Sequence, residues 1–443
     1  MMYNIPEEKN MNTSTYAGKM LEFIKKSPSC FHAVENIKQL LVASGFTEIN
    51  ETDKWELKPQ GKYFVSRNGS ALIAFIMPDS PVPEAFYITA AHSDSPCFKV
   101  KENPEMKSAG IVRLNIEKYG GMLIRPWFDR PLGIAGRVIY RESGTDAIKI
   151  GQKLVCVDKN LLMIPNLAIH MNRDANDGGK INAQSELLPL VSSCADFSLT
   201  ELLASLAGIP ADSIIGHDIF LYNRDEPSFW GYQDEFICSP RLDDLECVFS
   251  CCTGFVNAAC TGSDGVRAFC MFDNEEVGSQ SRQGAASTFL KDVLHRICLC
   301  SGCTEEDYQR AVAKGFLISA DNAHAVHPNY VQAADPVNQP AVNGGPVLKF
   351  NASQKYTTDG LSAAVFREIC RKAGVPYQVY TNNSNTPGGS TLGNISTKQV
   401  SICSVDIGLA QWAMHSPMES AGAKDVDYLV EVVKSFYSNP VRT

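Results

Sequence analysis

The 443-residue chain lacks several features that would place it in a specialised class of proteins. It has no uninterrupted run of about 18 apolar residues, the length that spans a bilayer, so we predict no membrane contact. It has no Lys- or Arg-rich run, and its net charge of -9 disfavours binding along a nucleic-acid backbone. It also has no internal repeat and no low-complexity tract, which excludes solenoid and linker architectures.

The N-terminal MMYNIPEEKN is polar and has no apolar stretch behind a basic lead, so we predict a cytoplasmic protein. Fifteen cysteines is an odd number, and many lie in apolar segments. We therefore interpret them as small buried residues and not as a disulfide framework. One cluster offers soft ligands for a structural metal, although it also has the pattern of a helix that runs into a turn: His295, Cys298, Cys300 and Cys303.

The length of the chain and the change in its pattern of helix-like and strand-like segments predict two domains, because one hydrophobic core rarely serves more than about 250 to 300 residues. Residues 1–99 and 236–443 alternate helical patterns with short apolar strands. This alternation predicts a catalytic α/β domain with a mainly parallel central sheet flanked by helices. Residues 100–235 carry strand-like stretches punctuated by Gly and Pro, so we predict an inserted β-rich domain there.

Polar residues follow four of the apolar strands of the predicted sheet. HSD at 92–94 follows FYITAA, DNEE at 273–276 follows RAFCMF, DNAH at 321–324 follows FLISA, and His415 comes after SICSV. Because sites gather outside the carboxyl ends of strands in open α/β sheets, we expect these groups to meet in one crevice. Two histidines with several carboxylates are typical ligands of zinc-type divalent ions, and the number of carboxylates favours more than one ion.

The adjacent Glu275 and Glu276 are the most informative pair. Two neighbouring carboxylates repel each other at the end of a buried strand unless a metal or a shared proton offsets the repulsion. With a metal present, one can bind it while the other accepts a proton from the attacking water. His92 and Asp94 point the same way in an extended segment, so Asp94 can orient a ligating His92 ring.

Three further candidate ligands can each be explained by a purely structural role, without a metal, when taken alone. Asp243 in SPRLDDL sits at the start of a predicted helix, where Asp is a common N-terminal residue. Asp321 can form a turn, and His415 can be a packed histidine. Their joint placement after successive strands is what favours the metal site.

These motifs together resemble those of the aspartyl aminopeptidase family of cocatalytic zinc peptidases, in its bacterial form. The resemblance implies a zinc exopeptidase-like α/β fold and covers nearly the whole chain. Five motifs occur in the order found in the family: HSDSP at 92–96, SPRLDDL at 239–245, DNEEVGS at 273–279, SADNAHAVHPN at 319–329 and MHSPMES at 414–420.

The resemblance implies an enzyme that binds two divalent ions per subunit, expected to be Zn²⁺, with Co²⁺ or Mn²⁺ as alternatives. In this family pattern Glu275 is the general base and Asp94 supports the first histidine. The implied ligands are His92 and Asp321 for one ion, Glu276 and His415 for the other, and Asp243 as the bridge between them.

The resemblance also implies residues that contact the substrate: His170, His324, Lys349 and Tyr356. The ammonium group of Lys349 would face an acidic side chain, so we expect release of N-terminal Asp or Glu from short peptides. In the family, the position of His170 reaches the active site of a neighbouring subunit. Family members form closed homo-oligomers, commonly dodecamers built from dimers.

The chain departs from the family pattern at two places. Asp244 stands where Asn is common, and the loop TPGGSTLGN at 386–394 has Pro387 and Gly388 where many relatives have Pro-Cys-Gly. We expect the first departure to affect metal preference or affinity and the second to affect the shape of the specificity pocket. Some relatives favour neutral N-terminal residues, and such a preference is one alternative. A metal-dependent deacylase or carboxypeptidase is a second alternative, and a catalytically silent assembly protein is a third.

Overall fold

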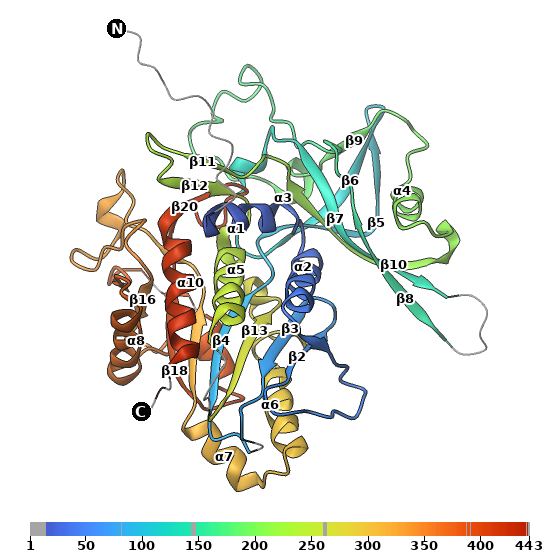
Figure 1. The fold of residues 1–443 in the computed structure, drawn as a ribbon. Helices are drawn as coiled ribbons and strands as arrows, with labels where there is room; N and C mark the ends of the chain where they lie inside the picture. The colour runs from blue at the N-terminus through green and yellow to red at the C-terminus, as the bar shows by residue number, and fades with distance from the viewer. Residues whose placement is uncertain are drawn as a thin grey trace.

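The structure is a computed structural model that describes residues 15–80, 82–142, 148–259, 264–386, 388–389, 391–439 and 441 (Figure 1). The described chain folds into three β-sheets and the helices that pack on them. None of the described helices is long and apolar enough to cross a bilayer.

The largest sheet has nine strands and forms the centre of the molecule. Its four middle strands, β13, β4, β14 and β18, run parallel to one another. In spatial order the sheet comprises β1 (Thr47–Glu48), β2 (Lys62–Arg67), β3 (Ala71–Ile76), β13 (Val266–Phe272), β4 (Phe86–His92), β14 (Phe316–Ala320), β18 (Cys403–Gly408), β16 (Val347–Phe350) and β17 (Gln378–Thr381).

The central sheet is mixed in direction, which corrects the prediction of a mainly parallel sheet. Antiparallel pairing occurs between β2 and β3, between β3 and β13, and between β18 and β16. The apolar pattern of a strand shows that both of its faces are buried, but it carries no information on the direction of the neighbouring strand. The parallel arrangement holds for the middle strands, which are the ones that position the site.

Helices cover both faces of the central sheet. As a result, every residue of its middle strands β13, β4 and β14 is buried. Along β4, Tyr87 and Ala91 pack into one core, while Phe86, Ile88 and Ala90 pack into the other. The first core includes residues of α1 (Tyr16–Lys25), α2 (Cys30–Ala43), α5 (Leu242–Asn257), α8 (Gly360–Ala373) and α10 (Ala423–Ser438). The second includes residues of α6 (Phe289–Cys300), α7 (Glu305–Ala313) and α9 (Leu392–Ser396).

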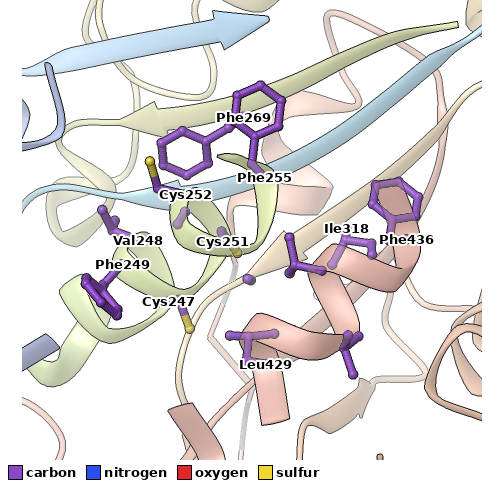
Figure 2. Close-up of a cluster of buried hydrophobic side chains, with 14 of the residues drawn as sticks. Cys247, Val248, Phe249, Cys251, Cys252, Phe255, Phe269, Ile318, Leu429 and Phe436 are labelled. Atoms are coloured by element: carbon purple, nitrogen blue, oxygen red, sulfur yellow. The ribbon is translucent and has the colours of Figure 1, made fainter. Parts of the chain in front are cut away.

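The cysteines of α5 pack as small apolar residues, as the sequence indicates. Figure 2 shows Cys247 and Cys251 on the side of α5 that faces Leu429 of α10, and Cys252 on the other side of the helix. All three thiols lie in fully buried residues of the first core. The described cysteines are all free thiols, while Cys260 lies outside the described residues.

A second sheet of six strands is antiparallel throughout and has its own core. The helices α3 (Ala183–Glu186) and α4 (Leu199–Ala207) contribute residues to that core. Its strands are β8 (Ile150–Cys156), β7 (Leu132–Arg141), β10 (Ile214–Asn223), β5 (Cys97–Ser108), β6 (Ile111–Tyr119) and β9 (Leu190–Ser192). The division into domains at residues 99 and 236 stays a prediction.

A third sheet joins short strands that are far apart in the sequence. Its order is β11 (Ser228–Trp230), β12 (Phe236–Ser239), β20 (Glu419–Gly422), β19 (Ala410–Trp412) and β15 (Ala323–His324). The antiparallel pairing of β12 with β20 brings Ser239 opposite Glu419. This sheet therefore places the chain before Asp243 beside the chain after His415.

Candidate metal centre

The four polar segments predicted to converge do meet at one edge of the central sheet. β13, β4, β14 and β18 are neighbours and parallel, so their carboxyl ends open on the same side. His92 is the last residue of β4, Asp321 follows β14 at once, and Glu275 and Glu276 follow β13 in the 3₁₀ turn η3 (Glu275–Val277). His415 arrives from β18 through β19.

Two groups of side chains with the geometry of metal ligands share Asp243. One group contains His92, Asp243 and Asp321 together with Asp244, and the other contains Asp243, Glu276 and His415. In the first, His92 Nε2 lies 3.3 Å from Asp243 Oδ1 and 3.8 Å from Asp321 Oδ1. In the second, His415 Nε2 lies 3.3 Å from Asp243 Oδ2 and 3.4 Å from Glu276 Oε1.

Unsatisfied oxygens show that these residues fit divalent ions. Asp243 Oδ1 and Glu276 Oε1 are buried and have no hydrogen-bond partner within the described part of the chain. A buried carboxylate oxygen without a partner is costly unless a cation offsets its charge. Burial raises the pKa of Glu275 to about 8 and that of Glu276 well above its usual value. Oxygen and imidazole donors of this kind suit zinc.

Asp94 lies beside His92, as predicted, and also contacts the turn after β13. His92 Nδ1 lies 3.0 Å from the main-chain oxygen of Asp94 and 3.4 Å from its Oδ1, so the carbonyl is the nearer acceptor. The Asp94 carboxylate accepts the main-chain N–H groups of Glu275 and Glu276, each at 3.1 Å. Asp94 therefore fixes the turn that carries both glutamates as well as lying beside the histidine.

Two supporting residues escape sequence reasoning. Tyr119, at the end of β6 in the second sheet, donates its hydroxyl to Asp94 Oδ2 at 2.7 Å. Glu419, only 1% exposed, accepts the N–H groups of Asp243 and His415. Burial, followed by the charge of Asp243, raises the pKa of Glu419 to about 8. The available signal was the position of Glu419 within MHSPMES, four residues after His415.

Asp244 belongs to the first group and is fully buried, and the peptide bond that joins it to Asp243 is cis. Its Oδ2 accepts the N–H of His92 at 3.0 Å, while its Oδ1 has no partner among the described residues. Burial raises the pKa of Asp244 well above its usual value, and the charges of Asp321 and Asp243 raise it further.

Replacing Asp244 by Asn should stabilise the metal-free protein, and more so at pH about 8 than at about 5. A carboxyl group whose pKa is raised by folding destabilises the fold as the pH rises from its unfolded pKa of about 4 through its folded pKa. Asn keeps an oxygen for the His92 N–H and removes the charge. We expect a gain of about 1 to 3 kcal/mol at the higher pH, measured by chemical denaturation. Equal effects at both pH values would contradict this explanation.

The structure brings three of the four predicted substrate residues near the centre. Lys349 Nζ lies 3.6 Å from Asp321 Oδ2, donates to the Asn322 carbonyl at 2.9 Å, and sits 5.6 Å from the centre of the Tyr356 ring. Burial lowers the pKa of Lys349, but the negative groups around it, chiefly Asp321, together outweigh burial and the net shift is upward. His324 packs its ring against Tyr380.

His170 is not brought to the centre within this chain. It is exposed on the segment between β8 and α3. Leu167, Ile169 and Met171 around it are also exposed, at 55%, 46% and 75%.

The loop at 386–394 is shaped by steric fit. Pro387 lies outside the described residues. A Cβ atom at Gly388 would come within 2.8 Å of the Asn351 side chain and 2.9 Å of the Asn382 side chain, so a larger residue there requires both amides to move. Thr391, the N-cap of α9, donates to Asp406.

The cysteine-rich cluster of the sequence lies at the end of α6 and just beyond it: His295, Cys298, Cys300 and Cys303. α6 ends at Cys300, and Gly302 follows in the left-handed conformation. His295 Nε2 lies 3.0 Å from Glu305 Oε2, and Cys300 Sγ points to the Trp55 carbonyl. The groups with ligand geometry in the described chain do not include these residues.

Comparison with known proteins agrees with this geometry. The family model Aminopeptidase I zinc metalloprotease (M18) matches residues 23–437. A probable M18 family aminopeptidase 2 from Clostridium acetobutylicum is 48% identical over 434 residues, which cover 96% of this chain and 99% of that one. A protein of the same name from Pseudomonas aeruginosa is 42% identical over 428 residues, covering 95% and 97%.

Solved structures of similar proteins share the fold. A chain from the cryo-EM structure of the Ape4 and Nbr1 complex matches with a TM-score of 0.92 and 33% identity, over 98% of this chain and 87% of that one. The mApe1 dodecamer of S. cerevisiae matches with a TM-score of 0.84 and 27% identity, over 96% and 97%. These matches confirm the resemblance that the five sequence motifs indicate. The chain therefore belongs to the M18 family of zinc metalloproteases and is a metallo-aminopeptidase, an enzyme that hydrolyses peptides.

Proposed function

We propose that the chain is a dinuclear zinc aminopeptidase that releases N-terminal Asp or Glu from short peptides. The observation that carries the proposal is the pair of ligand groups that share Asp243. A single ion would leave one group with its carboxylates uncompensated in a buried setting. Two ions, expected to be Zn²⁺ with Co²⁺ or Mn²⁺ as alternatives, would offset both groups.

In this proposal each ligand has a defined place. His92 and Asp321 would hold one ion, Glu276 and His415 would hold the other, and Asp243 would be shared by both. The 3.3 Å separations from the two Asp243 oxygens to His92 and His415 support this division, since the two imidazoles approach opposite oxygens.

Bound divalent ions would polarise the scissile carbonyl and acidify the attacking water. The proton then passes through Glu275, which accepts it from the water and donates it to the departing amine. A base with a pKa near the working pH does this efficiently. Asp94 keeps Glu275 in place by accepting its main-chain N–H.

The preference for acidic residues rests on Lys349, whose ammonium group is buried beside the centre. Its neighbour Asp321 would give up part of this contact on binding an ion, which would leave the ammonium group for a substrate carboxylate. A preference for neutral N-terminal residues is the alternative, because Lys349 already pairs with Asp321 and donates to Asn322.

We also propose that the protein acts as a homo-oligomer, a dodecamer built from dimers. The similar mApe1 structure is a dodecamer. The exposed apolar side chains around His170 suit a surface that a second subunit covers. His170 would then contact substrate in a neighbouring subunit, which is consistent with its distance from the centre of its own chain. A cytoplasmic location and the division into domains at residues 99 and 236 remain predictions.

A dipeptide panel tests the substrate proposal. With Zn²⁺, Co²⁺ or Mn²⁺ supplied, Asp-Ala should be cleaved with a kcat/KM about 10- to 100-fold above that of Asn-Ala, because a charge-assisted contact is worth about 1.5 to 3 kcal/mol. Released amino acids and bound metal are measured on the same sample. Equal rates for the two dipeptides would favour the neutral alternative, and cleavage of N-acetyl-Asp would favour a deacylase. Failure to release any N-terminal residue would refute the proposal.

A further inference from the structure

Glu419 binds the main chain of two proposed metal ligands at once. Its Oε2 accepts the N–H of Asp243 at 3.0 Å, and its Oε1 accepts the N–H of His415 at 2.7 Å. The residue is 1% exposed, so water does not compete for these bonds. One carboxylate thus joins two segments that are far apart in the sequence.

The third sheet explains how Glu419 reaches both partners. Its strand β20 pairs with β12, and Glu419 lies opposite Ser239 at the end of β12. The chain leaves β12 through Pro240 and arrives at Asp243 beside the carboxylate. His415 precedes Glu419 by four residues and has a positive φ of 68°, and its N–H donates to Glu419 across this short segment.

We propose that Glu419 is a positioning residue that sets the separation between Asp243 and His415, and thereby the affinity of the group formed by Asp243, Glu276 and His415 for its ion. This inference rests on the proposed dinuclear function. His415 is on a turn and its side chain is 32% exposed, and its carbonyl accepts the N–H of Leu123 at 3.1 Å. The bond from Glu419 restrains that turn at the residue itself.

The chemistry of the contact favours a carboxylate over an amide. Both oxygens of Glu419 face N–H donors, and the Gln411 Nε2 lies 3.5 Å from Oε1 as a third. Two bound cations would favour the ionised form of Glu419. The ionised carboxylate accepts on both oxygens, whereas a Gln side chain must direct its NH₂ group at one of the donors. Glu419→Gln therefore removes one of the two bonds while nearly keeping the volume.

Asp425 provides a matched control within the same chain. It is fully buried, and its two oxygens accept the N–H groups of Gly345 at 2.8 Å and Asn343 at 2.6 Å. Asp425 thus makes the same kind of double contact, but neither of its partners is a proposed ligand. Asp425→Asn should lower the stability of the fold in the same way and leave the metal centre intact.

The experiment compares E419Q, D425N and the wild type as full-length protein. Zn²⁺ affinities are measured by competition with a chelator, Co²⁺ absorption spectra report the ligand geometry, and thermal unfolding of the metal-free forms reports stability. We expect both variants to unfold at lower temperatures than the wild type. Only E419Q should bind one of its two ions about 10- to 100-fold more weakly and change the Co²⁺ spectrum.

Two results would overturn the inference: E419Q that binds both ions as tightly as the wild type, or D425N that weakens binding by the same factor. If E419Q does not fold, E419D, which keeps both acceptor oxygens on a shorter side chain, carries the same comparison. A wild type that binds fewer than two ions would instead refute the dinuclear function, so the two failures are distinguishable.

Discussion

Replacing Glu275 by Gln should lower kcat for release of the N-terminal residue by about 100- to 10,000-fold, the contribution expected of a general acid and base. The Gln side chain matches Glu in size but does not take up a proton from water at neutral pH. Because Asp243 and His415 still complete their group with Glu276, both ions should stay bound. Steady-state kinetics and metal analysis on the same preparation measure the two effects together.

The neighbouring glutamate is the control for this substitution. Glu276→Gln changes the same type of side chain one position along, within the same turn, but removes a proposed ligand. It should lose an ion as well as activity, and added Zn²⁺ should restore part of the activity. If Glu275→Gln kept activity within a few fold of the wild type, Glu275 would not be the base. If it lost an ion, Glu275 would be a ligand.

Asp243→Asn should deplete both ions, from about two per chain toward none, and abolish measurable activity. Asp243 is the shared member of the two ligand groups and is 2% exposed. A neutral amide offers one oxygen in place of two, so it cannot serve both ions, and it leaves the positive charges less compensated. Metal content after dialysis against low free Zn²⁺ is the direct measurement.

His415→Ala separates loss of one ion from loss of both. His415 belongs only to the group with Asp243 and Glu276, so its removal should weaken a single ion. Two tightly held ions in Asp243→Asn would exclude a bridging role for this residue. Thermal unfolding of the metal-free variants should resemble that of the metal-free wild type, which shows that metal loss is not a consequence of unfolding.

The central part of the fold could be predicted because its strands can be recognised from short stretches of sequence. FYITAAH is too short for a helix and apolar throughout, and it forms the fully buried β4. The convergence of His92, Glu276 and Asp321 follows from parallel strands that end at one edge. Strand direction at β3 and β16 was not predictable, because an apolar run looks the same in either direction.

The supporting contacts could not be predicted, since they depend on main-chain groups brought together by tertiary structure. Nothing near Glu419 in the sequence indicates that the Asp243 N–H lies beside it, because that contact depends on the pairing of two four-residue strands, β12 and β20. The same holds for Asp94, whose carboxylate binds the turn after β13. Sequence patterns place side chains on a strand face, but they do not place N–H donors from another segment.

The hydroxyl group of Tyr119 has a consequence for how this enzyme can be altered. Tyr119 comes from the second sheet, yet it donates to Asp94, which accepts the N–H groups of both glutamates. The reaction centre therefore draws part of its scaffold from a sheet that supplies none of the proposed metal ligands. A shortened enzyme that kept the central sheet and every ligand but discarded the second sheet would lose this brace. An engineered variant should therefore retain both sheets, because the second sheet helps to hold the residues of the metal centre in place.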